Sequence, residues 1–125
     1  MKILVIEDNP DMAKMILDDL DEFPNVTVVR NVQKAVQFLS CQNADYDVVL
    51  TDMQMPMKDN GFIKRDAGIE VIRVAVALGL PVILMSSAID LVPKHIRDLA
   101  TATLQKDSKK GLYADAIRKV LEEQK

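Results

Sequence analysis

Acidic, hydroxyl and basic side chains follow directly after four short apolar segments of the sequence. They are Glu7 and Asp8 after the first segment, Asp52 after the third, Ser86 and Ser87 after the fourth, and Lys106 after the fifth. If these segments are parallel strands of one sheet, their carboxyl ends lie at the same edge, where open α/β sheets bind ligands. The spacing therefore predicts one site that contains three carboxylates, hydroxyl groups and an ammonium group.

Such a site is typical of cation-assisted phosphoryl chemistry. Three neighbouring carboxylates are unfavourable unless a cation compensates their charge, and their oxygen atoms are suitable ligands for Mg²⁺. A carboxylate can attack a phosphoryl group to form an aspartyl phosphate, while a metal ion and Lys106 stabilise the charge on the phosphoryl oxygens. Taken singly, an Asp or Ser after a strand is most often a turn or helix-cap residue. The coincidence at four strand ends favours the functional interpretation.

Apolar runs that alternate with amphipathic patterns predict the elements that position these side chains. Strands are expected at 3–6, 26–29, 46–51, 81–85 and 101–105. Helices are expected at 10–23, 32–39, 68–79, 91–99 and 113–121. Nearly continuous apolar strands are typical of a parallel sheet that is buried on both faces, and right-handed crossovers place helices on both sides of it. The pattern predicts a doubly wound (βα)₅ α/β fold.

The composition fits one domain and argues against several classes of partner. The chain has 125 residues, 49% of them hydrophobic, and a net charge of −3. Its only basic cluster is Lys106, Lys109 and Lys110, so direct binding to nucleic acid or to an anionic membrane is not expected. The single Cys41 rules out an internal disulfide bond, and no apolar stretch approaches about 20 residues. We expect a soluble, cytoplasmic, single-domain protein that spans residues 1–125 without an output domain.

The residues at the strand ends resemble the receiver domain of response regulators in two-component signalling, and the resemblance covers the whole chain. The segment from Asp52 to Pro56, Asp-Met-Gln-Met-Pro, is similar to the family's phosphoacceptor loop. Ser87 with Ala88 is similar to the step at the end of its fourth strand, and Lys106 to the lysine of its fifth strand. The resemblance implies a CheY-like, flavodoxin-like fold with strand order 2-1-3-4-5.

The resemblance also implies a role for each site residue. Asp52 would take a phosphoryl group from a phosphohistidine on a sensor histidine kinase or phosphotransfer protein. The cofactor would be Mg²⁺, with Mn²⁺ as the alternative. The implied metal ligands are Asp8 and Asp52 directly, Glu7 through water, and the backbone carbonyl of Gln54. Ser87 and Lys106 would contact the phosphoryl oxygens. The protein would catalyse only its own phosphorylation and dephosphorylation, so it would not be an enzyme in the usual sense.

The expected output is a surface change that controls a downstream protein. The resemblance implies that phosphorylation reshapes the fourth helix, the fifth strand and the fifth helix, which here correspond roughly to residues 90–121. The chain would be a monomer or a phosphorylation-dependent dimer.

Two departures concern the residues around Lys106. Asp107 follows it, where the family usually has a Pro in a cis bond. A cis bond without Pro costs about 2.5–4 kcal/mol, so we expect a trans peptide and a less firmly placed Lys106. Thr103 stands where the family often has an aromatic residue, so we expect a smaller or different switch.

A third departure is the length of the segment after Asp52. Gly68 resembles the usual start of the third helix, which makes residues 58–67 an insertion. Asp59-Asn60-Gly61 offers a rival register. We expect the insertion to be a mobile surface loop beside the site.

Three competing functions are weighed against phosphotransfer. A receiver-fold scaffold without phosphorylation stays open because Lys106 lacks the following Pro. A small aspartyl-phosphate phosphatase of the haloacid dehalogenase type requires an acidic residue two positions after the nucleophile. Gln54 stands at that position, which disfavours this function. A nucleotide-binding flavodoxin-like domain is disfavoured because the first strand–helix turn, residues 7–10, is acidic and has no glycine.

Overall fold

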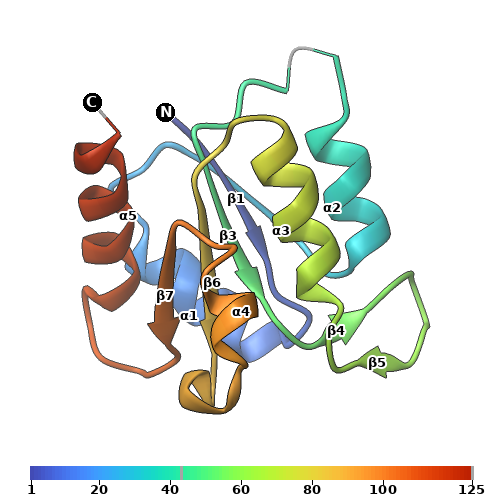
Figure 1. Cartoon of the computed structure of the whole chain (residues 1–125). Coiled ribbons are helices and arrows are strands. Elements are labelled where there is room, and N and C mark those ends of the chain that lie inside the picture. The colour runs from blue at the N-terminus through green and yellow to red at the C-terminus, as the bar shows by residue number, and fades with distance from the viewer. Residues whose placement is uncertain (43, 125) are drawn as a thin grey trace.

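A five-stranded parallel sheet lies between two layers of helices (Figure 1). The structure is a computed structural model that describes residues 1–42 and 44–124. Across the sheet the strands are β2 (Asn25–Val29), β1 (Lys2–Ile6), β3 (Val48–Asp52), β6 (Val82–Ser86) and β7 (Ala102–Gln105). All four neighbouring pairs are parallel. Because β6 and β7 are the fourth and fifth strands of this sheet, the expected order 2-1-3-4-5 is confirmed.

Five α-helices cover the sheet or close its edge. They are α1 (Pro10–Asp19), α2 (Val32–Leu39), α3 (Gly68–Ala77), α4 (Lys94–Arg97) and α5 (Leu112–Glu123). The helices α2 and α3 lie on one face of the sheet, and α1 and α5 lie on the other (Figure 1). No helix within the described residues is long and apolar enough to cross a membrane.

The alternation of side chains along the strands divides the core into two halves. In β1, Leu4 and Ile6 pack with α2 and α3, whereas Ile3 and Val5 pack with α1 and α5. All four of these side chains are buried, because successive residues of a strand point to opposite faces. The central strands are therefore held on both sides, and this fixes the positions at which their carboxyl ends emerge.

Two asparagines start the first two helices, as their sequence context predicts. The side-chain oxygen of Asn9 accepts a hydrogen bond from the backbone N–H of Met12 at 3.0 Å, and Pro10 occupies the first helical position. Asn31 accepts in the same way from the N–H of Lys34 at 2.8 Å. Both contacts satisfy donors that a helix start leaves free. The first helix ends at Asp19, four residues before the expected end.

The expected continuous helix over 91–99 is wrong. A single 3₁₀ turn at Ile89–Leu91 is followed by an extended Val92 and then by the four-residue α4. Pro93 explains the break, because proline disfavours helical backbone in the residue before it and has no N–H for the helix ladder. Two short helical turns, separated by Val92 and Pro93, therefore lie between β6 and β7 in place of one helix.

The segment 58–67, expected to be a mobile loop, contains the turn and the second strand of a β-hairpin. Its strands are β4 (Met55–Pro56) and β5 (Ile63–Lys64), which pair antiparallel. Two hydrogen bonds tie its turn to the start of α2: Gln33 N–H donates to the Met57 carbonyl at 2.8 Å, and the Asn31 amide donates to Asp59 Oδ1 at 2.6 Å. The insertion is therefore an anchored element, and α3 begins at Gly68 as expected.

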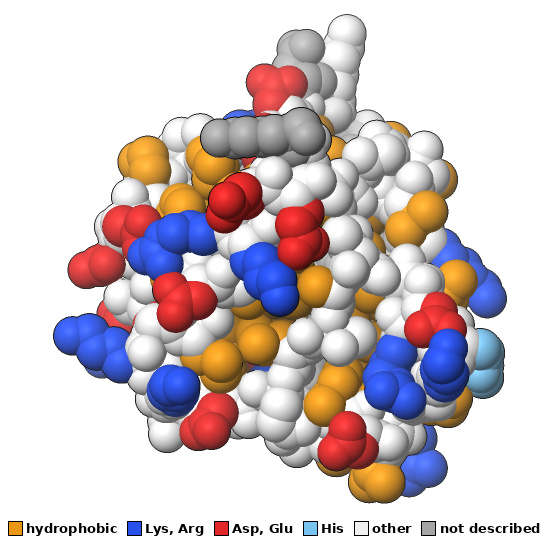
Figure 2. All heavy atoms as spheres, turned by 60° about the vertical axis from the view of Figure 1, so that its left-hand side comes forward, with side chains coloured by type: hydrophobic (Ala, Val, Ile, Leu, Met, Phe, Trp, Pro, Cys, Tyr) orange, Lys and Arg blue, Asp and Glu red, His pale blue; other side chains and the backbone are white. Residues whose placement is uncertain are grey.

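On the face that Figure 2 shows, basic and acidic side chains are interspersed among apolar ones. Arg118 of α5 forms ion pairs with Glu22 and with Asp115. Opposite charges that alternate in this way largely cancel one another's field at a distance.

Candidate functional site

One cleft of about 340 Å³ opens at the carboxyl edge of the sheet. It is lined by Glu7, Asp8, Asn9, Asp52, Gln54, Ile63, Ser86, Ser87, Ala88 and Lys106. The structure thus brings together every residue that the sequence predicts for the site. Two lining residues were not foreseen there. Asn9 was recognised only as a helix cap, and Ile63 reaches the cleft from the hairpin, whose sequence carries no signal for this contact.

The register of β1 and β3 places the acidic residues side by side. Ile6 of β1 pairs with Thr51 of β3. Glu7 and Asp52 are the next residues on these neighbouring strands, and Asp8 follows Glu7 into the turn before α1. Carboxylate oxygens of Glu7, Asp8 and Asp52 lie within 4.8 Å of one another. A cation of suitable size can therefore contact all three groups.

The acidic cluster carries more negative charge than the chain compensates. Glu7 is 0% exposed and Asp52 is 7% exposed. Burial raises the pKa of Glu7 to about 7, with hydrogen bonding to Lys106 lowering it and repulsion from Asp52 raising it. Oε1 of Glu7 contacts the Lys106 ammonium group at 2.5 Å, and Oε2 accepts from the Asn9 N–H at 3.2 Å. A buried carboxylate beside two further carboxylates is a donor set that fits Mg²⁺.

Lys106 supplies the positive charge that the chain itself brings to this cluster. Its Nζ lies 2.8 Å from Asp52 Oδ2 and 2.5 Å from Glu7 Oε1. The side chain is only 8% exposed. Burial would lower the pKa of Lys106, but the hydrogen bonds to Asp52 and Glu7 outweigh burial and raise the pKa above its ordinary value. Lys106 is therefore charged at neutral pH.

The expected trans peptide after Lys106 is present, since none of the described residues has a cis peptide bond. The expected weaker placement of Lys106 is not observed. Its backbone N–H continues the sheet ladder by donating to the Ser86 carbonyl at 2.8 Å, and its ammonium group contacts both Glu7 and Asp52. Asp107 in place of Pro therefore does not displace the ammonium group from the carboxylates.

The two oxygens of Asp52 have different partners. Oδ1 accepts from the backbone N–H of Met53 at 2.7 Å, and Oδ2 accepts from Lys106. The start of α3 supports this loop closely: Gly68 N–H donates to the Met53 carbonyl at 2.8 Å. A Cβ atom on Gly68 would lie 2.4 Å from the Asp52 carbonyl oxygen. Only glycine permits this approach of the helix to the backbone of Asp52.

The loop that carries Ser87 is bound to the last strand of the sheet. Ser86 pairs with Gln105, so Ser87 and Lys106 leave neighbouring strands at the same level. The Gln105 amide donates to the Ser87 carbonyl at 2.5 Å, and its oxygen accepts from the Ile89 N–H at 3.0 Å. Gln105 thus holds the backbone on both sides of Ala88, directly after the exposed Ser87. Sequence reasoning missed Gln105, because an outward-facing strand residue gives no signal for such a contact.

The arrangement can support nucleophilic attack by Asp52. The carboxylate is held in one orientation by an N–H and an ammonium group, beside two more carboxylates that can bind a cation. An anionic ligand in the cleft would meet the ammonium group of Lys106 and the exposed side chain of Ser87. These groups can stabilise charge on phosphoryl oxygens.

Comparisons with known proteins agree with this geometry. No family model matches the chain. The two-component response regulator ORR21 of rice, in both Oryza sativa subspecies, is 28% identical over 132 residues and aligns with 100% of this chain. The chain spans 18% of the length of these relatives.

Solved structures of receiver proteins share the fold. The response regulator TrrA of Thermotoga maritima, in complex with Mg²⁺-BeF, superimposes with a TM-score of 0.76 at 22% identity, over 96% of this chain and 99% of that chain. A CheY-like receiver domain of Methylobacillus flagellatus gives a TM-score of 0.73 at 18% identity, over 96% and 98%. The chain thus has the CheY-like α/β fold of these proteins, and all of it is similar to one part of a curated response regulator; both findings support a receiver domain of the response regulator type.

Proposed function

We propose that the chain is the phospho-accepting receiver of a two-component or phosphorelay system, with Asp52 as the phosphoacceptor. The observation that carries this proposal is the contact of Lys106 Nζ with Asp52 Oδ2 at 2.8 Å, in a cleft that also contains Glu7 and Asp8. The phosphoryl donor is a phosphohistidine on a histidine kinase or phosphotransfer protein, and the reaction takes place in the cytoplasm.

In the transfer step, an oxygen of Asp52 forms a bond to phosphorus while the bond from phosphorus to the donor's imidazole nitrogen breaks. The imidazole leaves with that electron pair and takes up a proton from solvent. The Lys106 ammonium group, which lies 2.8 Å from the Asp52 carboxylate, then forms an ion pair with a phosphoryl oxygen. The Ser87 hydroxyl donates a hydrogen bond to another phosphoryl oxygen. The chain acts only on itself, so it is a signalling module rather than an enzyme with a separate product.

Mg²⁺ is the cofactor that suits the donor set, and Mn²⁺, which also prefers oxygen ligands, is an alternative. Asp8 and Asp52 would hold it directly, Glu7 mostly through water, and the backbone carbonyl of Gln54 would complete the protein ligands. When bound, the ion neutralises charge on the carboxylates and on phosphoryl oxygens. The Mg²⁺-BeF complex of the similar protein TrrA supports this choice.

The output surface we propose is formed by α4, β7 and α5. Gln105 connects β7 to the loop of Ser87. A movement of Ser87 towards a phosphoryl group would therefore displace Gln105 and with it β7. A downstream protein, or a second copy of the chain, would read this change. Thr103 of β7 is exposed, and because it has no ring, the change would not involve an aromatic side chain at this position.

The test is phosphorylation by acetyl phosphate or phosphoramidate with Mg²⁺, read as the mass of the intact protein. We expect wild type to gain one phosphoryl group, and Asp52→Asn to gain none. Asp90→Asn, which removes an exposed acid outside the cleft, is the matched control and should gain the group as wild type does. An equal gain in Asp52→Asn would refute the assignment of the nucleophile. No gain in wild type would favour a receiver-fold scaffold that binds partners without this chemistry.

A further inference from the structure

The peptide after Lys106 is held by a side chain from a different element. Tyr113 lies in the first turn of α5 and is 1% exposed. Its hydroxyl accepts a hydrogen bond from the Asp107 backbone N–H at 3.3 Å and donates one to the Asp107 carbonyl at 3.1 Å. One oxygen atom therefore binds both backbone polar groups of the residue that follows the site lysine.

The surroundings of the Tyr113 hydroxyl favour this double role. Burial raises the pKa of Tyr113, although the hydrogen bond with the Asp107 backbone lowers it, so the hydroxyl keeps its proton at neutral pH and can donate. The Met12 Sδ lies 3.8 Å from the same oxygen. A hydroxyl has one proton, and the Asp107 carbonyl is the nearer and stronger acceptor, so Met12 serves as packing against the ring.

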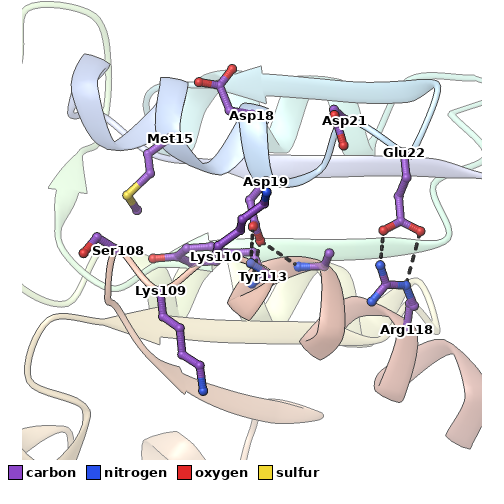
Figure 3. A pocket seen from close by; sticks show the side chains of 12 residues that line it. Met15, Asp18, Asp19, Asp21, Glu22, Ser108, Lys109, Lys110, Tyr113 and Arg118 are labelled. Atoms are coloured by element: carbon purple, nitrogen blue, oxygen red, sulfur yellow. Dashed lines mark hydrogen bonds and ion pairs between the residues drawn. The ribbon is translucent and has the colours of Figure 1, made fainter.

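The backbone of Tyr113 is held by Asp19 at the end of α1. Asp19 Oδ1 accepts from the N–H of Gly111 at 2.5 Å, and its Oδ2 accepts from the N–H groups of Tyr113 at 2.9 Å and Ala114 at 3.1 Å. Figure 3 shows the Asp19 carboxylate directed at the start of α5. Asp19 thus caps α5 from another helix and holds the backbone that carries the Tyr113 side chain.

We propose that Tyr113 is a positioning residue for Lys106. By holding both backbone groups of Asp107, its hydroxyl sets the direction in which the chain leaves β7, and so keeps the Lys106 ammonium group between Glu7 and Asp52. This role rests on the proposed phosphoacceptor function for its effect on chemistry, but the structural part of it does not.

The structural part is tested by NMR on wild type, Tyr113→Phe and Tyr46→Phe. Tyr46 is the control because its ring lies near Lys2 at the start of β1, 4.8 Å from that ammonium group, far from the site. In Tyr113→Phe we expect the Asp107 amide to exchange about tenfold faster and the Lys106 Nζ signal to shift. Neither should change in Tyr46→Phe. Unchanged Asp107 exchange or an unchanged Lys106 signal in Tyr113→Phe overturns the proposal.

The functional part is tested by a double-mutant cycle in the rate of phosphorylation by phosphoramidate with Mg²⁺. Tyr113→Phe should slow the reaction about tenfold, and Tyr113→Phe with Lys106→Ala should be as slow as Lys106→Ala alone, because Tyr113 acts through Lys106. Effects that multiply, or an unchanged rate in Tyr113→Phe, overturn the positioning role. If wild type takes up no phosphoryl group, the proposed function fails, and the NMR result alone decides the inference.

A second variant guards against a folding defect in Tyr113→Phe. Asp19→Asn keeps the size of the side chain but has one acceptor oxygen in place of two, so it loosens the start of α5 without touching the Tyr113 hydroxyl. In Asp19→Asn we expect Asp107 exchange and the Lys106 signal to change in the same direction as in Tyr113→Phe. An Asp19→Asn protein with wild-type values for both contradicts the proposed chain of contacts.

Discussion

At the scale of single residues, the buried carboxyl group of Glu7 couples the site to pH. Burial, the largest cause, raises its pKa from 4.5 to about 7. Between these values the folded protein holds a proton that the unfolded chain has released. The contribution of Glu7 to the free energy of unfolding is therefore fully present below pH 4.5 and is lost as the pH rises through about 7.

Glu7→Gln should remove this pH dependence. The variant cannot release the proton, so we expect its free energy of unfolding to fall less than that of wild type between pH 4.5 and about 7. Urea unfolding across this pH range measures the difference. Glu70→Gln, which removes an exposed carboxyl group on α3, is the control. Parallel profiles for wild type and Glu7→Gln would contradict the raised pKa.

At the scale of the elements, the hairpin β4–β5 depends on its link to α2. Asp59→Ala removes the hydrogen bond between the Asn31 amide and Asp59 but leaves the Asn31 cap of α2 in place. We expect a loss of about 0.5–1.5 kcal/mol in the free energy of unfolding and faster exchange of the Gln33 amide, which is bonded to the Met57 carbonyl.

The control for the hairpin is Asp66→Ala, between β5 and α3. Asp66 forms an exposed ion pair with Lys64 at 4.0 Å, and such pairs contribute about 0–1 kcal/mol. We expect unchanged Gln33 exchange in Asp66→Ala. Equal exchange in both variants would show that the hairpin is not held through Asp59.

The start of α3 is the element on which the backbone of Asp52 rests. Gly68→Ala would place a Cβ atom 2.4 Å from the Asp52 carbonyl oxygen and 2.9 Å from Met53 Cα. We expect the free energy of unfolding to fall by about 1–3 kcal/mol, as in other overpacked sites. Val76→Ala, on the exposed side of the same helix, should change stability by less than about 0.5 kcal/mol. Thermal unfolding of both proteins distinguishes a backbone clash from a general effect on α3.

The sequence predicts those elements whose patterns are local. The five strands of the main sheet and their polar ends follow from short apolar runs, and parallel pairing then brings Glu7, Asp52 and Lys106 together. The expected helix at 91–99 fails at Pro93, whose effect outweighs the apolar spacing around it. The hairpin was missed because its paired segments have only two residues each.

Contacts of side chains with the backbone of neighbouring loops could not be predicted in this way. Tyr113 fits the apolar stripe of α5, and nothing in that stripe indicates that its hydroxyl reaches Asp107. Gln105 likewise stands in an alternating strand pattern, which gives its direction but not its partners. Such contacts depend on the packing of α5 and of the loop after β6, which the sequence pattern leaves undetermined.

At the scale of the whole molecule, a cation at the acidic cluster should stabilise the fold. A ligand that binds only the folded state raises the free energy of unfolding by about 1.4 kcal/mol at ten times its dissociation constant. We expect Mg²⁺ to raise the melting temperature of wild type, and more strongly above pH 7 than below it, because protonated Glu7 competes with the ion.

Asp8→Asn should weaken this effect of Mg²⁺, because it removes one of the three clustered carboxylates. Asp90→Asn is the control and should respond as wild type does. Differential scanning calorimetry with Mg²⁺, and with Na⁺ at equal ionic strength, separates specific binding from screening. Equal shifts with both salts would contradict a divalent-cation site.

The order of the strands along the chain has a consequence for biosynthesis. The three carboxylates belong to the region of β1 and β3, whereas Lys106 comes 54 residues after Asp52. Because chains are made from the N-terminus, the ribosome completes the acidic cluster before it adds the lysine that neutralises part of it. During that interval the emerging segment lacks the ammonium group that contacts Glu7 and Asp52 in the folded protein.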